Sequence, residues 1–470
     1  MQYLLPDPYA LFTTILAASA LTVGLLWILI RHHAVGIFLV LAVHAWAVVD
    51  TPPSVVVLGT HVYPADVLSL CAAGVGLGRL LVHGLPRRTG LLPLLGLTGL
   101  TLWSALRGIA SFGPQAPVND ARVSFGYLLA AALYTATMPV GFPLERTLRR
   151  GWVAIALVFA VLCTTGWMRH GLHAVTEHVT ADGMVIDSRP VSAAAALVLA
   201  QAAILLLYAP SDQRRQARAT AVPDWLGRWV PAMVLLLFVV LLQHRTIWVV
   251  AVAMVMAGWA LRRSSGRTRL LSFTIAALSV SLAVVAYQLG AFGTVGGTLA
   301  TSAAEVQDSS SSFDWRVAGW QQLLAAPGSL VQWLSGMPFG SGYDRVVGGI
   351  LVTVGPHNYY VHLGLRLGMV GLALLIAWYV LTWRRLRQED AWSAALRVLM
   401  VGQLAFFVTY SADSEQGVLL GLCIWCLRTR AADSMSGQVA PGEPVVRLPG
   451  SAKPPASGAP TMPAMPGVSR

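Results

Sequence analysis

Four basic side chains stand where the sequence pattern does not require charge, and together they point to phosphate chemistry. Arg189, Arg245 and Arg316 lie beside or between apolar runs, and His357 stands just before another apolar run. Guanidinium groups bind phosphate oxygens in a bidentate way that a lysine cannot copy. An imidazole beside them could take a proton from a hydroxyl group near neutral pH. These residue types predict a site for a phosphorylated leaving group and a hydroxyl nucleophile.

Each of these residues also has a simpler explanation when taken alone. Arg245 could reach lipid headgroups from a tight turn, with Trp248 as an interfacial aromatic residue. Arg189 and Arg316 each follow an aspartate by two residues, so a surface ion pair would account for them. A single histidine at the start of a helix is more often structural than catalytic. The chemical interpretation therefore depends on the four residues acting together.

The sequence offers no ligand set for a metal ion beside these residues. No Asp-x-Asp pair and no cluster of His and Glu occurs near the same face, although a divalent cation usually needs such ligands to neutralise a phosphate. We therefore expect no metal and no other cofactor, with arginine supplying the positive charge.

The composition defines the setting in which these residues act. Of the 470 residues, 56% are hydrophobic and only 11% are charged, whereas soluble proteins carry about 25% charged residues. A soluble protein is excluded, and an all-α, polytopic membrane bundle is predicted. Several apolar runs are short, so we expect 12 or 13 spans, at residues 9–30, 34–49, 64–82, 91–106, 123–140, 152–168, 191–208, 229–243, 247–261, 270–290, 358–382, 394–411 and 416–427.

The arginines predict which connections face the cytoplasm. The net charge of +12 comes almost wholly from arginine, since Lys453 is the only lysine. By the positive-inside rule, clusters in alternate connections mark the cytoplasmic side, which explains the charge without a nucleic-acid partner. One large periplasmic loop is then expected at about residues 291–357. The clusters are at residues 87–88, 146–150, 214–218, 262–269, 384–387 and 428–430.

Two parts of different character are expected along the chain. Residues 1–430 form the membrane domain, and residues 431–470, rich in Pro, Gly, Ala and Ser, form a disordered cytoplasmic tail. No repeat of fixed period is visible, which argues against transporter folds built from repeated bundles. The four cysteines all lie in apolar runs, where we interpret them as buried thiols.

The motif at His357 resembles the O-antigen ligase and O-antigen polymerase superfamily of bacterial envelope glycosyltransferases. His357 and Asn358 are followed, after nine residues, by Gly368 and Gly371, in the form H-N-x9-G-x-x-G of O-antigen ligases. The two glycines also have a packing reason, because small residues three apart let a helix approach its neighbour closely.

The arginines carry the second part of this resemblance. Arg245 and Trp248 stand in a turn similar to that of the family, although Val249 replaces the leucine of the ligase pattern. Arg316 and the glycine-rich segment after it resemble the family's large loop, and Arg189 resembles the arginine at the outer end of an earlier span.

The resemblance implies a membrane glycosyltransferase of the bacterial inner membrane with its active site facing the periplasm. It implies about 12 spans and cytoplasmic termini, whereas 13 spans would place the N-terminus outside. Membrane lipids would surround the bundle, the donor would be a glycan on undecaprenyl diphosphate, and the acceptor another glycan or lipid A core. Arg189, Arg245 and Arg316 would bind the donor diphosphate, while Arg245 and His357 would be catalytic in an inverting, metal-independent transfer.

Three functions remain open from the sequence. An O-antigen ligase would move a finished chain onto lipid A core or a similar acceptor. An O-antigen or exopolysaccharide polymerase would join lipid-linked repeat units by the same chemistry. A transporter or lipid-linked glycan flippase is the alternative outside this class.

Overall fold

The computed structural model describes most of the chain, in ten segments. They comprise residues 8–49, 53–57, 60–84, 90–170, 176–179, 185–188, 190–208, 224–261, 312–386 and 391–436. Arg189 and the predicted span at 270–290 lie outside these residues, as does most of the predicted tail. Helix α18 (Ser414–Ser436) continues past residue 430, where the membrane domain was expected to end.

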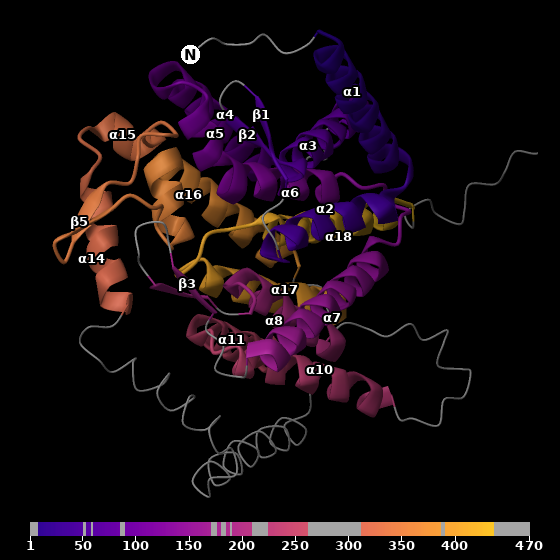
Figure 1. The fold of residues 1–470 in the computed structure, drawn as a ribbon. Helices are drawn as coiled ribbons and strands as arrows, with labels where there is room; N and C mark the ends of the chain where they lie inside the picture. Colours follow the sequence, from indigo (N-terminus) through magenta and orange to yellow (C-terminus); the bar gives the residue numbers. More distant parts are fainter. Residues whose placement is uncertain are drawn as a thin grey trace, which may run out of the picture.

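The described residues form a bundle of α-helices with three short hairpins (Figure 1). Each predicted apolar run in the described part is helical over most of its length. Besides α18, the helices are α1 (Pro8–Arg31), α2 (His33–Val49), α3 (Pro64–His83), α4 (Leu91–Phe112), α5 (Gln115–Ala121), α6 (Leu128–Ala136), α7 (Leu144–His170), α8 (Ala193–Tyr208), α10 (Asp224–Leu241), α11 (Arg245–Leu261), α14 (Ser312–Ala325), α15 (Leu330–Ser335), α16 (Tyr359–Arg385) and α17 (Ala391–Phe406). One π-helical turn, η1 (Arg122–Tyr127), joins α5 to α6.

Four of the described helices, α3, α4, α7 and α16, are long and apolar enough to cross a membrane. Further apolar helices in the described part are shorter, among them most of α8, α11 and α17. The protein is therefore an all-α membrane protein, as predicted. The count of 12 spans and the periplasmic side of the large loop stay predictions.

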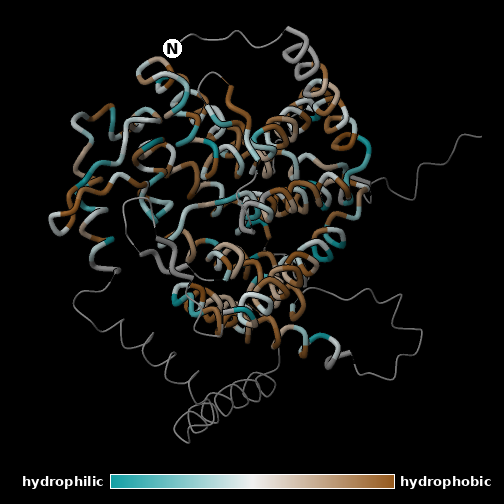
Figure 2. The backbone as a smooth tube through the Cα atoms, in the orientation of Figure 1, coloured by the Kyte–Doolittle hydropathy of each residue, from teal (hydrophilic) through white to brown (hydrophobic). Residues whose placement is uncertain are grey.

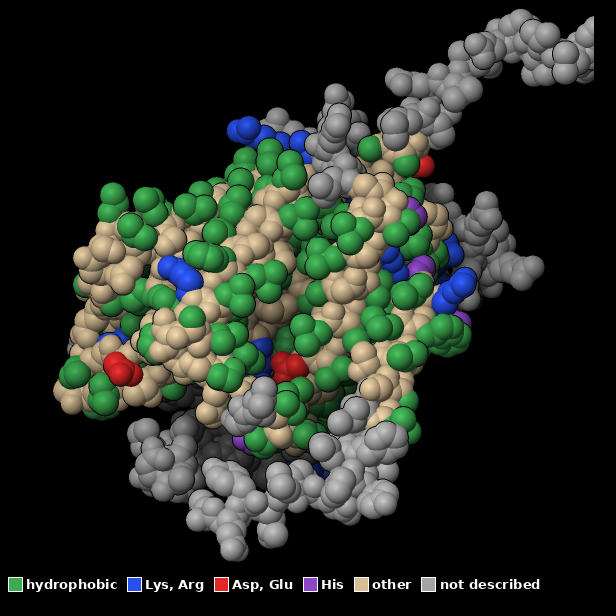
Figure 3. All heavy atoms as spheres, turned by 90° about the horizontal axis from the view of Figure 1, so that it is seen from above, with side chains coloured by type: hydrophobic (Ala, Val, Ile, Leu, Met, Phe, Trp, Pro, Cys, Tyr) green, Lys and Arg blue, Asp and Glu red, His purple; other side chains and the backbone are tan. Residues whose placement is uncertain are grey.

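The outer surface of the bundle is apolar, which fits a lipid environment. Leu70, Leu81 and Val82 on α3 are 75%, 86% and 78% exposed, and such side chains would be costly to leave in water. Figure 2 shows hydrophobic residues along most of the helices, and Figure 3 shows one face on which hydrophobic side chains are widespread and charged ones sparse. All four cysteines are buried and free, as predicted.

Close helix packing depends on small residues where helices lie side by side. Gly417 and Gly421 of α18 face α6, and a Cβ atom at Gly421 would stand 2.6 Å from the carbonyl oxygen of Ala132. At Gly417 a Cβ would collide with the carbonyl of Leu128. Glycines one turn apart thus let the backbones of α18 and α6 approach, as is typical inside membranes.

Each hairpin lies in a connection between helices that has no arginine cluster. They pair β1 (Val55–Val57) with β2 (Thr60–Val62), β3 (Thr176–Val179) with β4 (Val185–Ser188), and β5 (Arg345–Val347) with β6 (Ile350–Val352), each antiparallel. The hairpin of β5 and β6, together with α14 and α15, lies beside α16 at one edge of the bundle (Figure 1). This group forms the described part of the predicted large loop.

Helix α15 brings part of that loop against the middle of a membrane-spanning helix. The carbonyl of Leu334 meets Gly368, nine residues beyond the start of α16. On α15, Leu330 and Val331 are 74% and 68% exposed. Exposed apolar side chains beside a helix that could cross a membrane suit contact with lipid rather than water.

Cysteine labelling tests the predicted sidedness. Because the natural cysteines are buried, a new exposed thiol can be labelled selectively. Ile350→Cys, at the exposed hairpin, should react with a membrane-impermeant maleimide in spheroplasts. His83→Cys, at the arginine-rich end of α3, should react only in inside-out vesicles. Labelling of both thiols from the same side would contradict the topology.

Candidate active site

The start of α16 holds His357 at one end of the bundle. Asn358 caps the helix, because its side-chain oxygen accepts a hydrogen bond of 3.0 Å from the backbone N–H of Val361. The backbone N–H of Tyr359 donates to the carbonyl of Phe407, just beyond the end of α17, over 2.8 Å. Asn358 and Tyr359 are both buried. They hold the backbone in place next to His357, which is more exposed.

Two arginines approach His357 from the loop. Partial burial of the imidazole, followed by the positive charges of Arg316 and Arg345, lowers the pKa of His357 below its ordinary value. Arg316 comes from α14 and Arg345 from β5. Of the predicted residues, His357 and Arg316 are therefore near enough to interact electrostatically, and Arg345 also acts on His357. A neutral imidazole beside guanidinium groups suits proton removal next to a bound anion.

Arg345 is the residue of this group that the sequence analysis missed. Its side chain is buried, and its Nη1 donates to the carbonyls of Tyr343 and Val354 over 3.0 and 2.8 Å. These bonds join the two ends of the hairpin. The signal that could have identified it was present, since Arg345 is another arginine in the loop predicted to be periplasmic.

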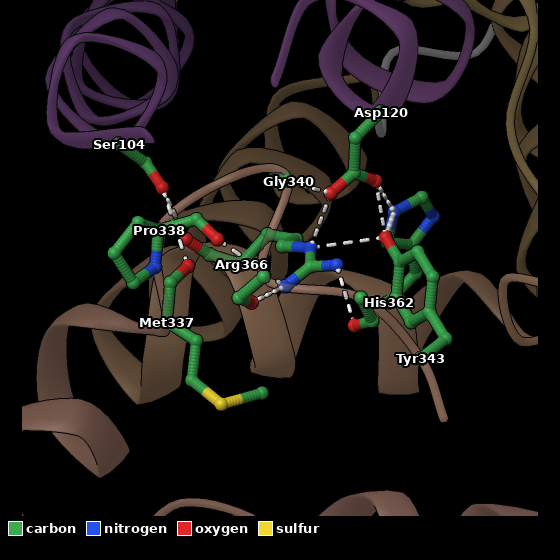
Figure 4. A network of polar contacts seen from close by, with 10 residues as sticks. Ser104, Asp120, Met337, Pro338, Gly340, Tyr343, His362 and Arg366 are labelled. Carbon is green, nitrogen blue, oxygen red and sulfur yellow. Dashed lines mark hydrogen bonds and ion pairs between the residues drawn. The ribbon is translucent and has the colours of Figure 1, made fainter. Parts of the chain in front are cut away.

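A second polar group, around Arg366, locks the loop to the bundle (Figure 4). Arg366 lies within α16 and is fully buried, and its Nε stands 2.7 Å from a carboxylate oxygen of Asp120 on α5. The same guanidinium donates to the Tyr343 hydroxyl over 3.0 Å, to the Gly342 carbonyl over 3.0 Å and to the Ser341 hydroxyl. One side chain therefore joins α5, α16 and the loop segment.

His362 and Tyr343 complete this buried group. The Nε2 atom of His362 lies 2.6 Å from the Tyr343 hydroxyl and 3.3 Å from Asp120. Burial alone would raise the pKa of Asp120, but the hydrogen bond with His362 and the charge of Arg366 outweigh it, so that the pKa is lowered. Burial raises the pKa of Tyr343 well above its usual value, so its hydroxyl stays protonated and donates to Asp120.

The glycine-rich segment before Tyr343 fits against α4 and α16 through its backbone. Ser104 on α4 donates to the carbonyl of Arg366 over 2.9 Å, and Arg107 donates to the carbonyl of Gly336 over 3.0 Å. Gly336 has a φ of 77°, and a Cβ there would collide with the Arg366 backbone. Only glycine satisfies both the conformation and the close approach.

The motif glycines of α16 have different surroundings. Gly368 has a φ of 65° and interrupts the helix, and a Cβ at this position would collide with the Leu334 carbonyl of α15. At Gly371, a Cβ would collide with Leu367 of the same helix, one turn earlier. Gly368 therefore permits both the bend in α16 and the contact with α15.

The turn that carries Arg245 is fixed by its neighbours. His244 is buried, and its Nε2–H donates to the carbonyl of Val191 over 3.0 Å. The indole N–H of Trp248 donates to the carbonyl of Val239 on α10 over 3.1 Å. Arg245 is the first residue of α11. Arg189 precedes Val191 by two residues in the sequence but lies outside the described residues.

The two arginine-bearing regions are linked through α17. Helix α17 packs against α11, where a Cβ at Gly402 would collide with the sulfur atom of Met254. The chain just beyond α17 then binds Tyr359 at the start of α16. Arg245 therefore begins, and His357 precedes, a helix that contacts α17 or the residue just beyond it. No group of three or more His, Cys, Asp and Glu residues in the described segments is placed to hold a metal ion.

Comparison with known families gives one match. Residues 230–376 match the family model described as O-Antigen ligase. The matched segment runs from α10 into α16 and includes Arg245, Arg316, Arg345, His357 and Arg366. No curated protein matches the chain.

Removal of the Arg366 charge should destabilise the protein. Arg366→Gln leaves Asp120 buried without its ion pair, which typically costs about 3–5 kcal/mol, so the midpoint of thermal unfolding should fall by roughly 10 °C. A thiol-reactive dye can follow unfolding in detergent because all four cysteines are buried. The matched control is Arg384→Gln, at an exposed position near the other end of α16. Equal midpoints for the two variants would contradict the structural role of Arg366.

Proposed function

We propose that the protein transfers a glycan from undecaprenyl diphosphate to an acceptor sugar hydroxyl, because residues 230–376 match the O-Antigen ligase family model. The superfamily points to a membrane enzyme of the glycosyltransferase type. The acceptor is lipid A core or a similar glycan, and transfer takes place at the periplasmic face of the inner membrane. The observation that carries this proposal is that α14, β5 and α16 pack together, so that the charges of Arg316 and Arg345 act on His357.

The proposed reaction uses the imidazole as a base and the guanidinium groups as the electrostatic partner of the leaving group. His357 removes the proton from the acceptor hydroxyl, whose oxygen attacks the anomeric carbon of the donor sugar. The bond between that carbon and the diphosphate oxygen breaks, and its electron pair leaves with undecaprenyl diphosphate. Attack from the opposite face inverts the anomeric centre.

Arginine neutralises the charge that develops on the diphosphate. Arg245 and Arg189 hold the diphosphate, and Arg316 contacts it from α14. Fixed donors of this kind are often the largest contribution to catalysis, and loss of one typically costs about 10²-fold in rate. Since the energy of the reaction resides in the lipid diphosphate, the transfer needs no nucleotide sugar or metal.

A polymerase that joins lipid-linked repeat units would use the same groups. Val249, which departs from the ligase pattern, is 67% exposed on α11, so this departure gives no reason to reject a ligase. The superfamily match favours glycan transfer over a transporter or flippase. The cellular products separate the two transfer functions. Loss of a ligase strands long chains on the lipid carrier, whereas loss of a polymerase leaves single repeat units.

Substitution of the two main residues tests the proposal in cells. In a strain that lacks the native enzyme, His357→Ala and Arg245→Ala should each reduce surface glycan by about 10²-fold or more, because one removes the base and the other a partner of the diphosphate. Arg31→Ala, at an exposed position remote from the site, serves as the control. Normal glycan with normal protein levels in both site variants would refute the assignment.

The acid limb of the pH profile tests the role of His357 as a base. Because partial burial and two arginines lower its pKa, the imidazole stays neutral below the usual histidine pKa of about 6.5. The value of kcat/KM should therefore fall only below that pH, since this ratio reports the free enzyme. Arg316→Gln should move the midpoint upward. An unchanged midpoint in this variant would argue against His357 as the titrating group.

A further inference from the structure

Arg345 has the features of a binding residue in addition to its structural bonds. Its side chain is only 7% exposed, yet its hydrogen bonds all come from Nη1. Its buried Nε has no hydrogen-bond partner within the described residues. A buried cation is costly unless a partner compensates it, so the charge of this guanidinium requires an explanation.

No carboxylate compensates Arg345 in the part of the chain that the structure describes. The ion pairs of Asp66 and Asp120 there engage Arg122, His362 and Arg366 instead. Asp344 is next to Arg345 in the chain but is exposed, and neighbouring residues of an extended chain point to opposite sides. Within the described residues, no acidic side chain therefore compensates the positive charge of Arg345.

Helix α14 is shaped to receive this arginine beside Arg316. Gly319 faces Arg345, and a Cβ at this position would stand only 2.8 Å from the Arg345 Nε atom. Residues three apart share one face of a helix, so Arg316 and Gly319 both point toward the hairpin. Both arginines act electrostatically on His357. Two guanidinium groups and an imidazole thus meet where α14, β5 and the start of α16 come together.

We propose that Arg345 is a binding residue for the donor diphosphate, which it holds together with Arg316 beside His357. This inference rests on the proposed function and extends its binding residues to one in the interior of the loop. The diphosphate supplies the negative charge that the described protein groups do not. The Nη2 nitrogen makes no hydrogen bond within the described residues, so it is the donor left for a phosphate oxygen.

The position of Arg345 is fixed before the donor arrives. Its Nη1 is bound to the Tyr343 carbonyl, and the Tyr343 side chain is held by Asp120 and Arg366. A prearranged donor loses little conformational freedom on binding. Bound diphosphate would also neutralise the arginines that act on His357, which makes the imidazole a stronger base only when the donor is present.

Binding of undecaprenyl diphosphate to the full-length protein in nanodiscs tests this role, with uncharged undecaprenol as the matched ligand. Arg345→Gln should weaken binding of the diphosphate about tenfold or more and leave undecaprenol binding unchanged. Arg345→Lys, which keeps the charge, should recover part of the loss. The control variant is Gln322→Ala, which removes two uncharged hydrogen bonds between α14 and Val346 of the same strand. It should change binding less than twofold.

The outcomes separate this inference from the proposed function. A diphosphate affinity in Arg345→Gln within twofold of the unchanged protein would overturn the role of Arg345 and leave the proposed function intact. Equal losses in Arg345→Gln and Gln322→Ala would also overturn it, because Arg345 would then only support the hairpin. If the unchanged protein failed to prefer the diphosphate over undecaprenol, the proposed function itself would be contradicted.

Discussion

The ion pair between Arg366 and Asp120 is the interaction on which the arrangement of the candidate site depends. It is buried between α5, α16 and the loop, where an unpaired charge would be strongly destabilising. Because the guanidinium also binds Ser341, Gly342 and Tyr343, the loop has a defined position on the bundle. The Tyr343 carbonyl in turn accepts a hydrogen bond from Arg345 and so helps to position that side chain.

The site therefore consists of charged side chains that are held in position on an apolar helix bundle. Hydrophobic packing and close glycine contacts position the helices, but they do not select one orientation for a surface loop. The hydrogen bonds of Arg366 hold the loop in one orientation. The cap at Asn358 fixes the start of α16. The structural arginine Arg366 and the proposed binding residue Arg345 thus differ in their partners. Arg366 has a carboxylate, whereas Arg345 lacks one within the described residues.

Much of this could be predicted from the sequence. Apolar runs predicted the helices because backbone groups must be satisfied internally in lipid, and the motif at His357 predicted the family model that residues 230–376 match. Arg366 was missed, although a charge within a predicted span is itself a signal of a buried partner. Its partner, Asp120, is distant in the sequence, so spacing could not reveal the pair. The bend at Gly368 depends on α15, which periodicity could not place.

The proposed function requires that guanidinium groups and His357 carry out glycan transfer from a lipid diphosphate without a metal ion. The most direct measurement is transfer by the purified protein, in the presence of EDTA, from a defined glycan on undecaprenyl diphosphate to lipid A core or to a second lipid-linked glycan. The account predicts that transfer and release of undecaprenyl diphosphate proceed in equal amounts, and that His357→Gln abolishes both. Transfer that requires added Mg²⁺ or Mn²⁺, or that persists in His357→Gln, would contradict it.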